Sequence, residues 1–353
     1  MNNSPLFTAT KSMHYRVQGG FSITELMVAM TLGLFLSAGI IQIYISNRHT
    51  NRLNSAVSAI QENGRFAQEM LTNAVRQAAG SGCPVTNSID PLSTTPPWWQ
   101  DFDNPLQGFD GTAAFSAVAF GTSAGDRVSG TDAIIALGTS GGYFLTSTTG
   151  TPTSAITLTT LTQSVGSTLS VNDMGIICNS TDTSLFQVGS IVGNTVNFAS
   201  AATVVYGTDA TVVDYVPTAF YIGVSTSGTN RSLYQIELSG GAMVAQELVE
   251  GVEDMQLFYG VDTTGPDANG DLAADTYQTA TTVTAGNNWS NVTSVRIYLL
   301  LSSVDEDNLI DQAQTYLFTT DSGTDSNTLR PLQATDRRLY RVFSTTANIR
   351  NRL

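Results

Sequence analysis

The sequence predicts an α+β protein in which a long N-terminal α-helix packs on a β-rich antiparallel globular domain. Apolar residues run almost unbroken from Phe21 to Ile45, and a helical pattern of apolar residues then continues to Ala78. No proline interrupts the chain between Phe21 and Gly82. From Asp132 onward, short β-branched runs alternate with turn residues, as in an antiparallel sheet.

The apolar run carries one formal charge, Glu25. About 25 apolar residues suffice to cross a bilayer core, which needs roughly 20 in a helix. A carboxylate within such a span costs about 2.5–3.5 kcal/mol on insertion scales, which makes Glu25 a candidate functional residue. The alternative is a simple signal-anchor helix whose Glu25 reaches back to the membrane surface.

Gly20-Phe21 followed by Ser-Ile-Thr-Glu-Leu-Met-Val-Ala-Met resembles the class III signal of type IV prepilins and type II secretion pseudopilins. The resemblance implies that a prepilin peptidase cleaves between Gly20 and Phe21 and methylates the new amine of Phe21. It also implies that Glu25 is the assembly carboxylate of this family. Ser22 and Ile23 depart mildly from the usual threonine and leucine.

Cleavage at this junction would place a positive amine one helical turn from Glu25. The carboxylate can partly offset that charge in its own subunit, as acidic groups do near a helix N-terminus. It can also pair with the amine of a neighbouring subunit, and the cost of an unpaired buried charge would then set the stagger between subunits.

Residues 1–20 form the expected leader, with Lys11, His14 and Arg16 and no acid. The positive-inside bias keeps this leader in the cytoplasm and places the chain after about Asn47 in the periplasm. A secretory signal is cleaved after its apolar region, whereas this cleavage precedes it, so the helix stays attached. We therefore expect a leader (1–20), a transmembrane and filament-core helix (21–46), its amphipathic continuation (47–82) and a periplasmic β-rich domain (83–353), anchored once in the inner membrane.

The amphipathic continuation is expected to pack on the protein's own sheet. Gly33, Gly39 and Gly64 are positions where the helix could bend, and Gly80-Ser81-Gly82 before Pro84 ends it. The apolar stripe consists of Leu53, Ala56, Val57, Ile60, Ala67, Met70, Leu71, Ala74, Val75 and Ala78.

Several segments resemble the PilW group of type IV pilus minor pilins. The resemblance implies a type IV pilin-like fold and a role in assembling or priming the pilus. It implies other minor and major pilins, the prepilin peptidase and the inner-membrane assembly machinery as partners. The segments are 61–67, 78–83, Cys178 with 184–188, 247–253, 289–292 with 295–297, and 336–343.

Expected strands follow a loop that contains Trp98 and Trp99. This tryptophan pair either covers the edge of the core or contacts a partner. The strands are Ala133–Leu137, Ala155–Leu161, Gly175–Cys178, Leu185–Val188, Thr195–Phe198, Thr211–Tyr215, Thr218–Val224, Ser232–Leu238, Asp254–Val261, Val292–Ser302 and Thr315–Thr319.

The two cysteines, Cys83 and Cys178, fit an oxidising compartment and a single disulfide that would tie the helix end to the sheet. Two free buried thiols are the alternative. Asp267, Asn269, Asp271 and Asp275 are spaced like the start of a calcium loop. However, the glycine and the final glutamate of such a loop are misplaced, so an acidic hairpin turn without a cofactor is the competing interpretation.

The net charge of the chain is −14. Such an acidic surface repels the phosphates of nucleic acids, so we expect no nucleic-acid partner. Residues 330–353 are basic and are interpreted as a solvated tail or as an electrostatic dock for an acidic neighbour. Glu247, Glu250 and Glu253 recur at helical spacing and are interpreted as a solvated face.

No set of nucleophile and base, metal triad or phosphate-binding loop is evident, so we expect no enzymatic activity. The leading hypothesis is a minor pilin. One alternative is a minor pseudopilin of a type II secretion system. The other is a pilus-borne adhesin or ligand-binding module, which would use the loop that contains Trp98 and Trp99 or the acidic turn that begins at Asp267.

Overall fold

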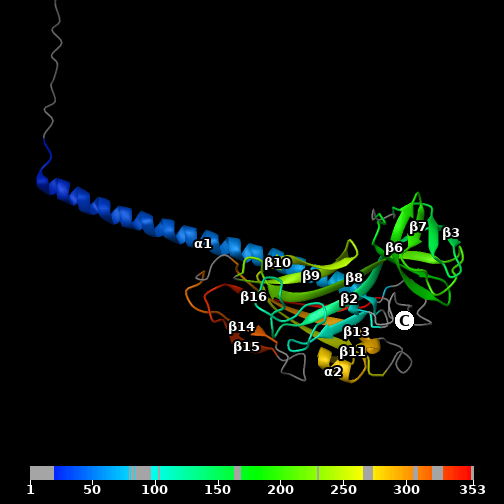
Figure 1. The fold of residues 1–353 in the computed structure, drawn as a ribbon. Coiled ribbons are helices and arrows are strands. Elements are labelled where there is room, and N and C mark those ends of the chain that lie inside the picture. The colour runs from blue at the N-terminus through cyan, green and yellow to red at the C-terminus, as the bar shows by residue number, and fades with distance from the viewer. Residues whose placement is uncertain are drawn as a thin grey trace, which may run out of the picture. The chain divides into compact units, whose positions relative to one another are not determined.

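The computed structural model describes residues 20–78, 80, 83, 97–101, 104–162, 168–228, 230–264, 273–304, 309–319 and 329–350. The chain divides into two compact units, residues 1–53 and residues 54–353. Helix α1 spans Ile23–Gln77 and contributes to both units (Figure 1). It is continuous through Gly33, Gly39 and Gly64, which confirms the long helix that the absence of proline predicts.

The larger of two main sheets has ten strands, all paired antiparallel, and is organised on β8 (Thr211–Val224). One edge of β8 pairs with β2 along its length, whereas the other edge pairs first with β5 and then with β9. The remaining bounds are β1 Leu106–Phe109, β2 Ala133–Tyr143, β3 Leu145–Thr149, β4 Ala155–Leu158, β5 Met174–Cys178, β6 Thr183–Val192, β7 Thr195–Phe198, β9 Arg231–Ser239 and β10 Ala242–Glu250.

A second sheet has the order β12-β11-β13-β16, and a two-stranded sheet joins β14 to β15. Their bounds are β11 Val252–Val261, β12 Thr276–Gln278, β13 Val292–Ser302, β14 Thr315–Phe318, β15 Arg330–Gln333 and β16 Tyr340–Asn348. Short helical segments are η1 Trp98–Gln100, α2 Ala280–Ala285 and η2 Trp289–Asn291. Strands β3, β6 and β7 gather at one end of the globular domain (Figure 1).

Every predicted strand lies on an observed one, and the α+β architecture is confirmed. The two predicted runs at Thr211–Tyr215 and Thr218–Val224 form a single strand, β8. Pro217, between them, stays in the strand and lies opposite Leu137 of β2. The pattern missed the short strands β1, β3, β12 and β15 and the longer strands β10 and β16. Half of β10 is polar or small, and β16 follows an arginine-rich stretch, so neither shows the apolar alternation that identifies a half-buried strand.

The main core lies where α1 meets both large sheets. Buried α1 positions recur at three- or four-residue intervals, as one face of a helix requires. The cluster includes Phe220 from the ten-stranded sheet and Leu257 and Ile297 from the four-stranded sheet. The buried helix residues are Ile60, Gly64, Ala67, Leu71 and Val75, and Ala78 directly after the helix is also buried.

Candidate functional site

The first turn of α1 forms a reciprocal capping box between Ser22 and Glu25. The backbone N–H of Ser22 donates to Glu25 Oε2 at 3.1 Å, and the backbone N–H of Glu25 donates to Ser22 Oγ at 3.2 Å. This arrangement satisfies two backbone donors that no helical carbonyl can reach. The predicted assembly carboxylate therefore also holds the start of its own helix, a role that the Ser-x-x-Glu spacing could have indicated.

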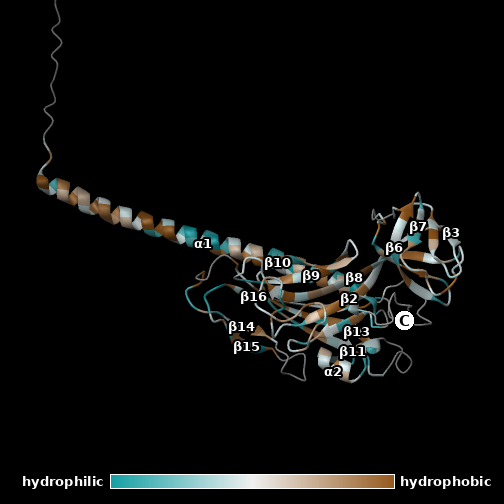
Figure 2. Cartoon of the chain, in the orientation of Figure 1, coloured by the Kyte–Doolittle hydropathy of each residue, from teal (hydrophilic) through white to brown (hydrophobic). Residues whose placement is uncertain are grey.

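The apolar part of α1 presents its side chains to the outside. Phe21, two residues before the helix begins, is 89% exposed. The most apolar 18-residue window of the helix has a mean hydropathy of 2.1, and none of it is buried. Figure 2 shows this half of the helix as predominantly hydrophobic and the following turns as polar. Within the described residues, α1 is the single helix long and apolar enough to cross a membrane.

Hydroxyl side chains in this segment bond back to their own helix. Thr31 Oγ1 donates to the carbonyl of Val28 at 2.9 Å, and Ser37 Oγ donates to the carbonyl of Gly33 at 2.8 Å. Such bonds satisfy polar groups without water. They suit an apolar environment, in which each unsatisfied polar group is costly.

Besides the apolar core, a tight ring contact and a hydrogen bond join the second half of α1 to the strands. Gly64 faces the ring of Phe343 on β16, and a β-carbon at Gly64 would lie 2.4 Å from the nearest ring atom. Asn63 Nδ2 donates to the carbonyl of Glu250, the last residue of β10, at 3.4 Å. In addition to apolar area, the helix is therefore fitted to the four-stranded sheet by a close backbone approach and to the ten-stranded sheet by a side-chain hydrogen bond.

The end of the helix is fixed by a disulfide between Cys83 and Cys178 of β5, with an S–S distance of 2.06 Å. This confirms the predicted pairing, and the alternative of two free thiols is wrong. The hydroxyl of Thr139 on β2 donates a hydrogen bond to the backbone carbonyl of Gly80, which precedes Cys83 by three residues in the chain. The chain leaving α1 is thus attached to β2 and β5, two strands of the ten-stranded sheet that flank β8.

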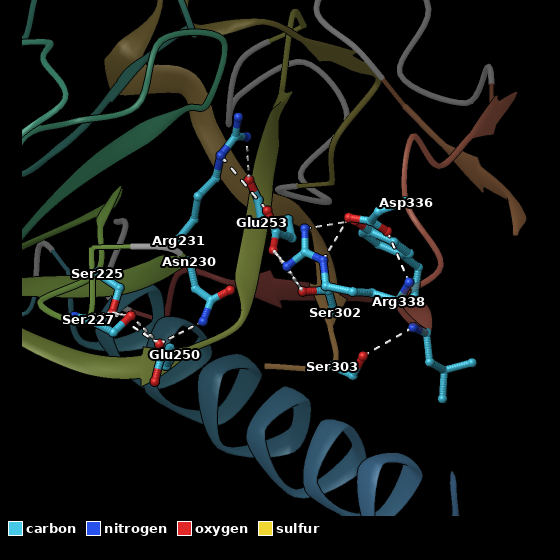
Figure 3. Close-up of polar contacts among 12 residues, drawn as sticks. Ser225, Ser227, Asn230, Arg231, Glu250, Glu253, Ser302, Ser303, Asp336 and Arg338 are labelled. Atoms are coloured by element: carbon cyan, nitrogen blue, oxygen red, sulfur yellow. Dashed lines mark hydrogen bonds and ion pairs between the residues drawn. The ribbon is translucent and has the colours of Figure 1, made fainter. Parts of the chain in front are cut away.

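Glu253 on β11 is the acceptor of a largely buried ion pair (Figure 3). It is 8% exposed. Its Oε1 lies 2.6 Å from Arg338 Nη1 and accepts a hydrogen bond from Ser302 Oγ of β13 at 2.7 Å. Arg231 of β9 approaches the other carboxylate oxygen at 3.8 Å. These contacts of Glu253 join both main sheets to the residues just before β16.

Arg338 is held on its other side by Asp336 and Tyr340. Its Nε donates to Asp336 Oδ2 at 2.8 Å, and its Nη2 donates to the Tyr340 hydroxyl at 2.9 Å. Burial raises the pKa of Asp336, but the hydrogen bonds and charge of Arg338 outweigh it and leave the pKa below its usual range. The interpretation of residues 330–353 as a solvated tail is wrong, because Arg338 is paired within the chain and β16 is part of a sheet.

Glu247 and Glu250 sit on strand β10, so their interpretation as a solvated helical face is wrong. Both accept hydrogen bonds from the turn between β8 and β9, where the single hydroxyl proton of Ser225 is shared between Glu247 at 2.8 Å and Glu250 at 3.2 Å. Burial raises the pKa of Glu247, but hydrogen bonds from Ser232, Thr226 and Ser225 outweigh it and lower that pKa to about 2. Both carboxylates thus fasten a turn.

The tryptophan pair lies against the core. Trp98 and Trp99 pack on a cluster that includes Phe115, whose ring centroid is 6.0 Å from that of Trp98. The hydroxyl of Tyr215 on β8 donates to the carbonyl of Trp99. This packing agrees with the interpretation that the pair covers an edge of the core.

Three of the four possible calcium ligands, Asp267, Asn269 and Asp271, lie outside the described residues. The fourth, Asp275, accepts hydrogen bonds from the backbone and hydroxyl of Thr263 at 2.9 and 2.8 Å. Among described residues, no group of three or more His, Cys, Asp or Glu is arranged to hold a metal ion. The calcium loop stays a prediction.

The geometry defines a protein with one exposed, membrane-compatible N-terminal helix and a disulfide-linked β-rich domain. Residues 219–351 match the family model PilW, Type IV Pilus-assembly protein W. The match begins within β8 and includes the residues of the Glu253–Arg338 pair and β16, which confirms the PilW resemblance there. No curated protein and no solved structure matches the chain.

Proposed function

We propose that this chain is a minor pilin that is needed to assemble or prime the type IV pilus. The observation that carries the proposal is the exposed apolar helix, with its Ser22–Glu25 cap directly after the Gly20-Phe21 junction, on a domain whose residues 219–351 match a pilus-assembly family. In this role the prepilin peptidase cleaves after Gly20 and methylates Phe21. The helix anchors the chain in the inner membrane, with the globular domain in the periplasm.

Assembly would then be non-covalent. The apolar side chains of the helix leave the bilayer for equally apolar surfaces on neighbouring pilin helices, where close packing rather than the hydrophobic effect drives association. Glu25 pairs with the amine of a neighbouring subunit, which fixes the stagger. Contacts of the globular domain select which minor or major pilins become neighbours.

The capping box allows the charge of Glu25 to be tested apart from its structural role. Glu25→Gln keeps an oxygen that can accept from the Ser22 N–H but removes the charge. Ser22→Ala removes one capping bond but keeps the charge. In a strain that lacks the protein, we expect Ser22→Ala to restore surface pili and Glu25→Gln to fail, with both proteins inserted in the membrane at wild-type levels.

Sheared surface pili, membrane fractionation and the mass of the mature N-terminus are the measurements. Normal piliation with Glu25→Gln contradicts the charge-pairing mechanism. Normal piliation in the deletion strain contradicts the assembly role. In that case, loss of secretion of folded enzymes would support a pseudopilin, and loss of surface adhesion would support an adhesin. The PilW match favours the pilus over the secretion system.

A further inference from the structure

Strand β10 is an open edge of the ten-stranded sheet. It pairs with β9 on one side only. In the part of the chain that the structure describes, the backbone of residues 242–247 has no hydrogen bond to any segment other than β9. Ala242, Val244, Ala245 and Gln246 are exposed, Val244 at 46%. Such an edge is a template for another strand.

The turn between β9 and β10 defines which backbone groups point outward. Gly240 and Gly241 have φ values of +60° and +86°, as a two-residue hairpin turn requires. The flanking pair, Ser239 and Ala242, is therefore a hydrogen-bonded pair, and pairs alternate from there along an antiparallel ladder. The N–H and C=O groups of Met243, Ala245 and Glu247 consequently point away from β9.

Other edges of the sheets carry features that block pairing. Strands β1, β12 and β3 have four, three and five residues. On β16, Gln314 occupies both backbone groups of Tyr340 at 2.9 and 3.0 Å, and exposed Arg341 follows. By contrast, β10 has no lysine, arginine or proline. Its register shift lies between Glu247 and Val249, so six residues remain regular.

We propose that β10 docks an extended, basic segment of a neighbouring pilus subunit as an additional strand. The identity of the neighbour rests on the proposed function. No lysine or arginine occurs between Arg231 and Arg296, whereas Glu237, Glu247 and Glu250 lie on this hairpin. Opposite charges on adjacent strands stabilise pairing. The docked segment therefore carries lysine or arginine beside Glu247, and backbone hydrogen bonds supply its affinity.

The structure also limits where the docked strand ends. The side chain of Asn63 on α1 donates to the carbonyl of Glu250 at 3.4 Å, so the edge is closed at this end. The available edge runs from Ala242 to Glu247. A strand of about six residues fits it, which is a common strand length.

The test uses the full-length chain in piliated cells, with a photo-reactive amino acid in place of exposed Gln246. We expect a covalent adduct between this chain and another pilus subunit. Ala245→Pro removes an outward N–H while sparing the bonds to β9, and proline is tolerated at such edge positions. We expect it to reduce the adduct at least about tenfold, whereas the matched Ala245→Ser keeps the N–H and the adduct.

A second pair of variants covers the case in which Ala245→Pro fails to fold, judged by loss of the Cys83–Cys178 disulfide. Ala245→Lys should weaken the adduct with a basic partner, and Ala245→Glu should preserve it. A probe at Ser200, in an exposed turn, is the control site and should give no such adduct. Equal adducts from the Lys and Glu variants contradict a basic partner.

No adduct at Gln246, or one that folded Ala245→Pro leaves unchanged, overturns the docking edge. An adduct with a second copy of this chain, or with a protein outside the pilus, overturns the stated occupant. These outcomes are separate from the function, because Glu25→Gln tests assembly without altering β10. Normal piliation without the protein would instead overturn the function while leaving the strand pairing measurable.

Discussion

Gly64 on α1 and Phe343 on β16 approach so closely that the phenyl ring occupies the place of a side chain on the helix. Glycine is costly within a helix, by about 0.5–1 kcal/mol relative to alanine. Here the loss is offset by direct contact between an aromatic ring and the helix backbone. The contact joins two segments that are distant in the sequence.

We expect Gly64→Ala to lower the free energy of unfolding by about 1–3 kcal/mol, because the new methyl group overlaps the Phe343 ring. Thermal unfolding of the detergent-solubilised protein measures the change. Gly39→Ala is the matched control, since nothing lies within 4 Å of its β-carbon position. The double variant Gly64→Ala/Phe343→Ala should lose less than the sum of the single losses, and strict additivity would contradict the contact.

We expect Arg338→Met to destabilise the domain by about 3–5 kcal/mol, because it removes the close counter-ion of buried Glu253 and leaves only Arg231, 3.8 Å away. Replacing both partners, as Glu253→Met/Arg338→Met, should recover much of this loss. Denaturant unfolding of the single and double variants gives the coupling. If the single and the double variant lost the same free energy of unfolding, the ion pair would contribute little.

Stability should fall in acid partly through Glu247. Its pKa is lowered in the folded state from 4.5 to about 2. Its contribution is therefore fully present above about pH 4.5 and is lost as the pH falls toward 2. Glu247→Gln should flatten the dependence of the unfolding free energy on pH in this window. An unchanged profile would mean that other carboxylates account for the acid loss.

Reduction of the Cys83–Cys178 disulfide should lower the free energy of unfolding by about 2–5 kcal/mol, since the bridge closes a long loop with a sequence separation of 95. The Cys83→Ser/Cys178→Ser variant should unfold like the reduced wild type, and reductant should not affect it further. Equal stability of oxidised and reduced wild type would contradict a stabilising role.

The sequence could predict those features that depend on local pattern. Ile60, Ala67, Leu71 and Val75 repeat at the helical period, and uninterrupted β-branched runs mark the buried strands. Two cysteines permit one intramolecular pairing, so Cys83 and Cys178 required no knowledge of the fold. The Ser22–Glu25 cap was also within reach, since both residues belong to a single turn.

Only the tertiary structure decided the fate of the charges. Glu247, Glu250 and Glu253 fall at helical spacing, yet they lie on two strands because β9 and β13 provide hydrogen-bonding edges that no local pattern records. Arg338 belongs to a basic stretch, but besides its neighbour Asp336 it pairs with buried Glu253, 85 residues away. The sequence determined which segments can form a helix or strand; the pairing of distant strands determined which charges are buried, because burial depends on contacts between residues far apart in the chain.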